Sequence, residues 1–429
     1  MSPPRIAIIG GGPAGLTLAR LLYVAKVNVE VSVYESDASP TARTEQGGTL
    51  DLHTNTGLAA LRKCDIWESF LRYARYEGSE MILADKNHTE LVHVRGGERK
   101  GPFDRPEIDR ERLKEILLES LPEEYMRWDR RLKEVTEGGM LSFEGRKETE
   151  GPFDLIVGAD GAWSKVRMRL SDVKPSYAGV SGYEMEIKEP PKTCLHVDKM
   201  VGRGSFIGSS DQKMLNGQRM GNNSIKVRSW YTCSEGEAKR ILKEDGKEKT
   251  LEKILQRYRG WAPEMTELLK QADLDSIRVW ELYELPVGFT WTHKKGFTLI
   301  GDAASLATPF SGEGVNKAMK DSLELAEFIQ RSQLSEDNLT LDEAVLRYEV
   351  AMFPRAHRLQ RTTMMNKENT FGPAGPIGMI TGMLRTVASD SNSIFVRIIG
   401  TAPFVALVFS YFWIRQQIGL AVRKFWRKT

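Results

Sequence analysis

Three glycines near the start of the chain have a spacing suited to binding a phosphate group. Gly10, Gly12 and Gly15 follow GxGxxG spacing, between the apolar run Ile6–Ile9 and a stretch of leucines at helical spacing. In such a turn the first glycine permits tight bending, the second lets the backbone approach a pyrophosphate, and the third lets the helix pack closely on the strand. The helix N-terminus then presents free N–H groups to the phosphates. The spacing therefore predicts a dinucleotide site.

An acidic residue completes this predicted site. A second β-type run, Val29–Tyr34, leads into Glu35, at the distance from Gly15 where an acidic side chain accepts from a ribose hydroxyl. Ala14, inside the glycine turn, is assigned to the same site. This motif alone does not distinguish FAD from NAD.

Two later motifs consist of a buried type of strand that ends in a tight turn. One strand leads into Asp160-Gly161, and Ser164 and Arg167 follow at DGxxSxxR spacing. The other leads into Gly301-Asp302, then into a glycine-rich loop and a helix expected to run through Ala326. Strand, turn and helix alternate, as in a parallel α/β sheet.

With GxGxxG, DG and GD motifs in this order, the chain resembles the class A flavoprotein monooxygenases of the aromatic-hydroxylase type. The resemblance implies that FAD is the cofactor and that Asp302 holds its ribityl or ribose part. It also implies that Gly312 to Asn316 place backbone N–H groups near the flavin N1/C2 carbonyl edge. Reduced flavin is negative at that edge, and a helix N-terminus stabilises negative charge.

Within that family the chain is similar to the bacterial tetracycline-inactivating monooxygenases. The shared stretches are Gly47–His53, Pro106–Arg110 and Phe310–Asn316. Ser305, Thr308 and Glu313 depart from that group's pattern, although they do not affect the expectation of FAD binding. By this resemblance Arg110 touches the flavin. The full set of residues expected at FAD is Gly10, Gly12, Ala14, Gly15, Glu35, Gly48, Arg110, Asp160, Asp302, Gly312, Gly314, Val315 and Asn316.

The expected fold class is α/β, with a Rossmann-like FAD-binding domain interleaved with a β-sheet substrate domain, a long bridging helix and a hydrophobic tail. The expected boundaries are 1–77, 101–172 and 286–333 for the FAD-binding domain, 78–100 and 173–285 for the substrate domain, 338–370 for the bridging helix, and 371–429 for the C-terminal extension.

Period-two alternation over Ile225–Tyr231 predicts a half-buried antiparallel strand in the substrate domain. One face of such a strand packs on the core and the other is free to line a cavity. Glu184, Arg203, Lys226 and Arg228 are candidates for that lining, and rough alignment with the tetracycline-inactivating relatives assigns the first three to substrate contact. Solvated strand residues are the equally weighted alternative.

The C-terminal extension contains a 17-residue uncharged run, Ile398–Ile414, followed by the basic and aromatic stretch Arg423–Lys428. The run is at the lower length limit for crossing a bilayer. Three interpretations stay open: a tail anchor, an amphipathic segment in the membrane plane, or a hydrophobic helix docked on the protein. We expect a cytoplasmic protein whose C-terminus contacts a membrane in the first two cases.

The overall composition excludes several other classes. A net charge of +3, with no earlier basic run interleaved with aromatics, predicts no nucleic-acid partner. Three scattered cysteines and six scattered histidines predict neither a disulfide framework nor a metal site. No second GxGxxG unit follows a predicted strand, so no separate NAD(P)H domain is expected. The resemblance to the class A monooxygenases implies that NADPH or NADH docks transiently beside the flavin.

The predicted function is that of an NAD(P)H-driven, FAD-dependent monooxygenase of secondary metabolism. It would use O2, through a flavin C4a-hydroperoxide, to hydroxylate or epoxidise an electron-rich, lipophilic polycyclic or aromatic small molecule. The alternative is a flavin-dependent dehydrogenase or reductase on the same fold. Because the cofactor carries the hard chemistry, no catalytic side chain is identified.

Overall fold

The computed structural model describes residues 2–42, 47–97, 105–136, 138–333, 339–390 and 410–411. Internal packing divides the chain into two compact units. The first contains Met1–Tyr76, Arg99–Ser176 and Tyr283–Arg361, and the second contains Glu77–Glu98, Tyr177–Leu282 and Thr362–Thr429. Each unit is therefore assembled from segments that are far apart in the sequence.

The first unit is built on a five-stranded parallel sheet with the order β17-β11-β1-β2-β7. Its strands are β1 (Arg5–Ile9), β2 (Glu30–Tyr34), β7 (Met126–Arg127), β11 (Leu155–Gly158) and β17 (Phe297–Leu299). The register aligns the last residues of β1, β2, β11 and β17 across the sheet. Because parallel strands end at the same edge, the turns after β1, β11 and β17 must come together there.

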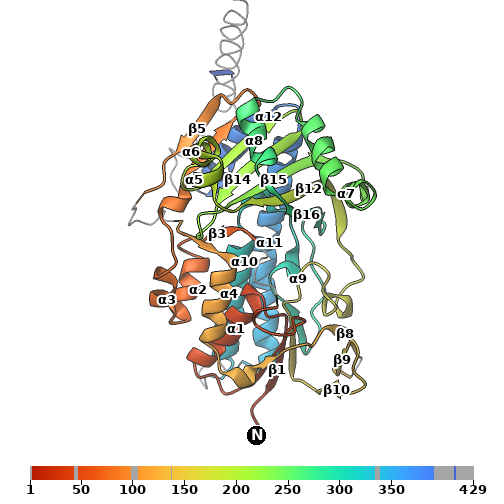
Figure 1. The fold of residues 1–429 in the computed structure, drawn as a ribbon. Helices are drawn as coiled ribbons and strands as arrows, with labels where there is room; N and C mark the ends of the chain where they lie inside the picture. Colours follow the sequence, from red (N-terminus) through yellow and green to blue (C-terminus); the bar gives the residue numbers. More distant parts are fainter. Residues whose placement is uncertain are drawn as a thin grey trace, which may run out of the picture. The chain divides into compact units, whose positions relative to one another are not determined.

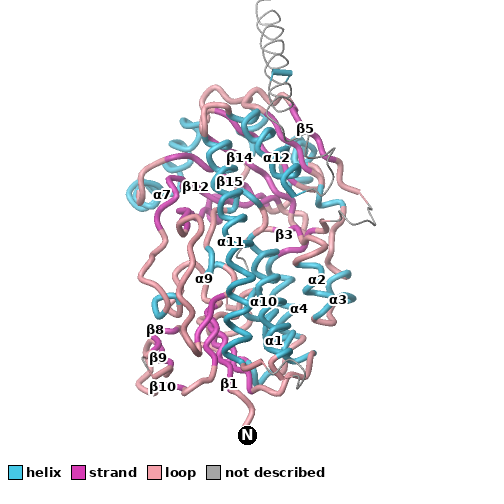
Figure 2. The backbone as a smooth tube through the Cα atoms, turned by 180° about the vertical axis from the view of Figure 1, so that it is seen from behind, coloured by secondary structure: helices cyan, strands magenta, loops and turns pink. Residues whose placement is uncertain are grey.

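Helices cover one side of this sheet. The helices of the first unit, before the long C-terminal one, are α1 (Pro13–Val24), α2 (Gly57–Lys63), α3 (Trp67–Leu71), α4 (Arg110–Glu119), α9 (Asp302–Ser305) and α10 (Gly314–Arg331). In Figures 1 and 2, α1, α4 and α10 gather on one side of β1, and the small sheet of β8 (Leu132–Val135), β9 (Leu141–Phe143) and β10 (Thr149–Glu150) lies on the other. A short ribbon pairs β3 (Thr49–Asp51) with β6 (Glu107–Asp109).

The second unit contains a seven-stranded sheet with the order β16-β12-β15-β14-β13-β4-β5. Its strands are β4 (Met81–Ala84), β5 (Glu90–Val94), β12 (Ser176–Ile187), β13 (Ser205–Ser210), β14 (Lys213–Arg219), β15 (Ile225–Thr232) and β16 (Asp273–Glu284). Tyr183, Val227 and Leu215 belong to the core on one face, with α6 (Leu195–Val201), α7 (Glu237–Arg257) and α8 (Pro263–Lys270). A short helix, α5 (Pro190–Thr193), precedes α6.

The long helix α11 (Leu341–Phe371) belongs to both units, because the division falls after Arg361. Its start is fixed by a capping box. The Thr340 hydroxyl accepts from the Glu343 N–H at 3.2 Å, and the Glu343 carboxylate accepts from the Thr340 N–H at 2.9 Å. Pro354 is accommodated inside the helix.

The glycines and prolines of residues 372–376 are typical of a loop, but the loop is shorter than this pattern indicates. A further helix, α12 (Gly375–Asp390), begins there, and Ile380 packs against Leu83 and Leu91 on the second face of the large sheet. Pro376 is tolerated because the first turn of a helix needs no N–H from it.

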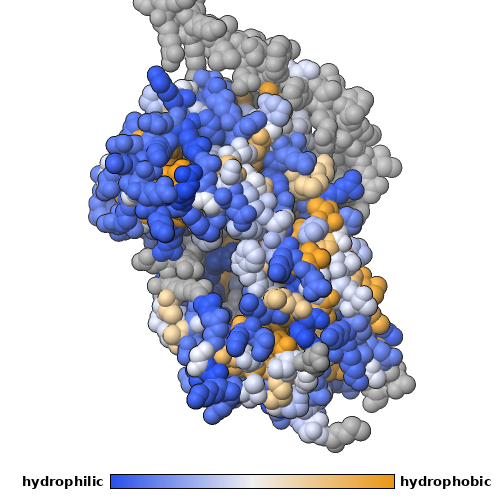
Figure 3. Space-filling view, turned by 90° about the vertical axis from the view of Figure 1, so that its right-hand side faces the viewer, coloured by the Kyte–Doolittle hydropathy of each residue, from blue (hydrophilic) through white to orange (hydrophobic). Residues whose placement is uncertain are grey.

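The run Ile398–Ile414 lies outside the described residues apart from Ser410 and Tyr411, and so does the basic stretch Arg423–Lys428. Within the described ranges, no helix combines the length and the apolar composition needed to cross a bilayer. On the face that Figure 3 shows, hydrophilic residues dominate and hydrophobic residues form scattered patches.

Candidate active site

At two glycines of the GxGxxG turn, neighbouring backbone atoms leave no space for a Cβ atom. A Cβ on Gly10 would lie 2.3 Å from the carbonyl oxygen of Ala159, and a Cβ on Gly15 would lie 2.0 Å from the carbonyl oxygen of Gly10. Gly12 differs, because a Cβ there would meet nothing within 4 Å. The chain itself therefore requires Gly10 and Gly15, whereas Gly12 leaves open space in front of the backbone.

The N-terminus of α1 faces this open space without a side-chain cap. Gly12 is the N-cap residue, Pro13 follows, and the first turn contains no acidic residue. Glu35, which is 8% exposed, accepts from the Gly11 N–H at 2.6 Å and from the Asp37 N–H at 2.9 Å. Glu35 thus closes the glycine turn, and the N–H groups of α1 stay available for an anion.

The DG motif carries an unsatisfied carboxylate oxygen. Oδ2 of Asp160 accepts from the Lys165 N–H at 2.7 Å, whereas Oδ1 is buried and has no hydrogen-bond partner among the described residues. Burial raises the pKa of Asp160, and hydrogen bonds from Ser164 and the following backbone oppose that rise. A buried acceptor without a donor is costly, so Oδ1 is suited to a ligand hydroxyl or N–H.

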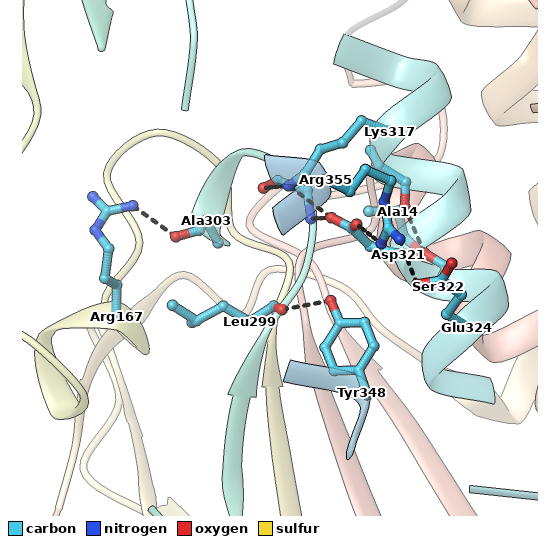
Figure 4. A network of polar contacts seen from close by, with 12 residues as sticks. Ala14, Arg167, Leu299, Ala303, Lys317, Asp321, Ser322, Glu324, Tyr348 and Arg355 are labelled. Atoms are coloured by element: carbon cyan, nitrogen blue, oxygen red, sulfur yellow. Dashed lines mark hydrogen bonds and ion pairs between the residues drawn. The ribbon is translucent and has the colours of Figure 1, made fainter. Parts of the chain in front are cut away.

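Arg167 joins the DG motif to the GD motif. Its guanidinium donates to the carbonyl oxygen of Ala303 at 3.0 Å (Figure 4) and to that of Ala162 at 2.6 Å. The side chain is buried, and this desolvation lowers its pKa. The DGxxSxxR spacing thus supplies a cross-link between the turns after β11 and β17.

The GD turn also contacts the first motif. Gly301 has φ +62°, and a Cβ there would lie 3.3 Å from the Ala14 side chain. Asp302 is exposed, although the surrounding protein desolvates its carboxyl group. That desolvation raises the pKa of Asp302, and the charges of Lys317 and Arg110 oppose the rise. Asp302 is therefore a carboxylate that is accessible to a ligand but partly shielded from water by the protein.

The loop before α10 presents a second uncapped helix N-terminus. Gly312 has φ +71°, a Cβ on Gly314 would meet nothing within 4 Å, and the N-cap residue Glu313 forms no side-chain cap. Val315 is buried. The Asn316 side chain holds the chain around residues 51–57: its Oδ1 accepts from the His53 N–H at 2.8 Å and its Nδ2 donates to the Asp51 carbonyl at 2.7 Å. The side-chain amide of Asn316 is thus hydrogen-bonded within the protein.

Arg110 and Gly48 meet at the start of α4. The Arg110 N–H donates to the Gly48 carbonyl at 3.2 Å. A Cβ on Gly47 would lie 2.7 Å from Cδ of Arg110, so glycine is needed for the arginine side chain to lie there. The Arg110 side chain is exposed.

These residues fit FAD. The uncapped N-termini of α1 and α10 match anionic or electron-rich groups of the cofactor. The unsatisfied oxygen of Asp160 and the exposed carboxylate of Asp302 match its hydroxyl donors. Gly12 leaves room for its pyrophosphate. The structure brings all thirteen residues of the predicted set into the first unit.

The predicted substrate residues lie in the second unit and do not all come together. Glu184 and Lys226 lie on one face of the sheet, each bound to the opposite strand. Glu184 accepts from Nε of Arg228 at 2.6 Å, and Lys226 donates to Glu186 at 2.8 Å. Arg203 instead lies in the turn before β13, is exposed, and donates its N–H to a carboxylate.

Sequence reasoning missed the buried polar residues of α10 and α11. Lys317 and Asp321 are 4% and 0% exposed and pair at 2.7 Å, and Arg355 reaches Asp321 at 2.8 Å. Lys317 and Asp321 stand four residues apart, a spacing that predicts an ion pair on a helix but does not predict its burial.

Comparison with known proteins agrees with this geometry. The FAD binding domain family matches residues 4–332. Monooxygenase asqM of Emericella nidulans is 31% identical over 382 residues, covering 77% of this chain and 84% of that one. An FAD-containing monooxygenase from Photorhabdus luminescens has a TM-score of 0.71 at 23% identity, covering 86% and 98% of the two chains. Tetracycline destructase Tet(51) has a TM-score of 0.62 at 17% identity, covering 86% and 92%.

Since the family match spans most of its length, the chain belongs to the FAD-binding domain family. Together with the monooxygenase relatives, this identifies an FAD-dependent monooxygenase and confirms the predicted α/β fold class.

Proposed function

We propose that this chain is an NAD(P)H-driven monooxygenase that hydroxylates or epoxidises an electron-rich, lipophilic aromatic or polycyclic molecule. The observation that carries the proposal is the meeting of three motifs at one sheet edge. Gly10 approaches Ala159, Ala14 approaches Gly301, and Arg167 binds Ala303. That edge is where an α/β sheet binds its ligand.

Each part of the edge has a proposed role. The open backbone at Gly12 and the N-terminus of α1 bind the pyrophosphate, and Glu35 accepts from the adenosine ribose while it closes the turn. Asp302 accepts from the ribityl chain, and Asp160 supplies a second acceptor. The N-terminus of α10 and Arg110 stabilise negative charge on the flavin ring. When bound, FAD supplies the redox chemistry that takes up two electrons and activates O2.

We further propose that the polar face of the second unit's sheet contacts the substrate. Arg228 and Lys226 each have a carboxylate within hydrogen-bond distance. A face whose charges are compensated in pairs favours a neutral ligand over an ionised one, because an anion would have to compete with Glu184 and Glu186. Glu184, Lys226 and Arg228 are thus proposed as substrate neighbours, whereas Arg203 lies in the turn before β13 and not beside them.

Anaerobic reduction tests the electron donor. Protein reconstituted with FAD is mixed with NADPH or NADH, and loss of the flavin absorbance is followed, with dithionite as the control reductant. We expect one of the nicotinamides to bleach the flavin, faster when 1-naphthol is present as an aromatic probe. Bleaching by dithionite alone would contradict a nicotinamide-driven enzyme.

The proposed location is the cytoplasm, with the C-terminal segment on a membrane surface. The support is the apolar run Ile398–Ile414 and the basic stretch Arg423–Lys428 that follows it. Flotation of the full chain with phosphatidylserine-containing vesicles, compared with phosphatidylcholine vesicles, tests this. Recovery in neither floating fraction would contradict it.

A further inference from the structure

The Gly301–Asp302 turn is held at both backbone groups of Gly301. The Gly301 N–H donates to Oδ2 of Asp321 at 3.0 Å, and the Gly301 carbonyl accepts from Nζ of Lys317 at 2.8 Å. Lys317 and Asp321 are one turn apart on α10 and pair with each other (Figure 4). Gly301 has φ +62° and ψ −142°, a conformation open to glycine alone. Because glycine also adopts many other conformations, hydrogen bonds to the turn are needed to select this one.

A second helix supports the same turn. Arg355 of α11 donates to Oδ1 of Asp321 at 2.8 Å and to Glu324 at 2.5 Å. About two turns earlier on α11, the Tyr348 hydroxyl donates to the Leu299 carbonyl at 3.0 Å, two residues before Gly301 (Figure 4). The end of β17 is therefore hydrogen-bonded to α11 directly, and the turn is connected to α11 through Asp321.

Stability alone is a poor reason for this arrangement. Burying an ion pair costs desolvation that its attraction often only offsets, and apolar residues of similar size serve stability as well. Lys317 and Asp321 are almost fully buried, and each bonds a backbone group of the turn besides its partner. Such directional bonds fix a conformation, which a hydrophobic contact does not.

We propose that Lys317, Asp321 and Arg355 are positioning residues that fix the Gly301–Asp302 turn for FAD, so that cofactor affinity depends on α11. The inference rests on the proposed role of Asp302 at the cofactor. It assigns Lys317 a second task. Nζ of Lys317 lies 2.8 Å from the Gly301 carbonyl, next to Asp302 in the chain. Burial and the charge of Asp321 raise the pKa of Asp302, and the positive charges of Lys317 and Arg110 oppose that rise, so the cation helps to keep the carboxyl group ionised as an acceptor.

The first test compares Arg355→Met with Arg358→Met, since Arg358 is an exposed arginine on the same helix. FAD affinity is measured by quenching of flavin fluorescence, and the Tm of each apoprotein is measured separately. We expect Arg355→Met to weaken FAD binding by about tenfold or more, as loss of a charged hydrogen bond does, while Arg358→Met stays within about twofold. Arg355→Lys should recover part of the affinity.

A lower apoprotein Tm for Arg355→Met with unchanged FAD affinity would overturn the inference and leave the network a structural one. Failure of the unaltered protein to bind FAD would instead overturn the proposed function. The two failures are thus distinguished.

The second test is the pH profile of FAD affinity in Lys317→Met. Removing the cation raises the pKa of Asp302, so its acceptor is lost at a higher pH than in the unaltered protein. We expect affinity to fall on acidification with a midpoint displaced upward, and Lys317→Arg to restore the original midpoint. A profile that merely shifts to lower affinity at every pH would contradict this role of Lys317. If Lys317→Met does not fold, the Arg355 variants still decide the proposal.

Discussion

The edge of the first unit's sheet where its parallel strands end and the polar face of the second unit's sheet consist of different chemical groups. At the edge, glycines and backbone groups dominate, and Gly10 and Gly15 leave no room for a Cβ. On the polar face, charged side chains from neighbouring strands pair with each other, as Glu184 does with Arg228. The first arrangement is imposed by steric exclusion between chain segments, and the second by cross-strand register.

This difference explains what each region can tolerate. A backbone site does not depend on the identity of most side chains, so many sequences share it and it is suited to a common cofactor. A paired side-chain face changes its charge and shape with single substitutions, so it is suited to selecting a particular substrate. Two sets of substitutions test this contrast directly, and two smaller effects are expected at the β3–β6 ribbon and at the start of α11.

The first substitutions separate two kinds of glycine within one motif. Gly15→Ala places a Cβ against the Gly10 carbonyl, and we expect destabilisation of about 4 kcal/mol or more. Gly12→Ala meets no protein atom, and its extended backbone accepts alanine. Gly12→Ala should therefore keep the apoprotein Tm and lose FAD affinity. Thermal unfolding and FAD titration measure the two effects, and equal loss of Tm in both variants would contradict the distinction.

The second substitution breaks a pair on the polar face. Arg228→Leu leaves the Glu184 carboxylate buried without its cation, and we expect a loss of about 3 kcal/mol in the free energy of unfolding. Glu184→Leu combined with Arg228→Leu should recover much of it, and FAD affinity should not change in either. Urea unfolding gives the stabilities. A double variant no better than the single one would show that the pair itself is not the source of the loss.

A pH effect is expected from Glu107 on the β3–β6 ribbon. Burial, with Asp51 and Asp109 nearby, raises its pKa from 4.5 to about 8, although Arg75 opposes the rise. Between these values the unfolded chain releases a proton that the folded protein keeps, so stability is lost as pH rises. The free energy of unfolding of Glu107→Gln, relative to that of the unaltered protein, should therefore increase from pH 5 to pH 8. The exposed Glu123→Gln serves as the control in urea unfolding, and parallel profiles for both would contradict the assignment.

The smallest effect is expected at the start of α11. Thr340→Ala removes the hydroxyl that accepts from Glu343, and such a cap should lower Tm by about 2–4 °C. Thr340→Ser should retain the original Tm within error, because serine keeps the hydroxyl. A fall in Tm for the serine variant equal to that for alanine would argue against the cap.

Sequence patterns anticipated the backbone site better than the side-chain contacts. The strands around Ile6–Ile9 and 297–300 were predictable because each is a short apolar run that ends in a glycine turn. The burial of Lys317 and Asp321 was not, since charged residues normally imply an exposed face. The partner of Glu184 needed the register of β12 and β15, which alternation alone does not give. The start of α12 was missed because glycine and proline also begin helices.

The most direct test of the central claim is the fate of molecular oxygen. Protein loaded with FAD is supplied with NADPH, ¹⁸O₂ and, in separate reactions, 1-naphthol or 1,8-dihydroxyanthraquinone. The masses of the products are then measured by mass spectrometry. We expect a product that carries one ¹⁸O atom from O2, formed as NADPH is consumed. Consumption of NADPH that yields only hydrogen peroxide with both probes, or a dehydrogenated product without label, would contradict a monooxygenase and indicate a flavin dehydrogenase or reductase.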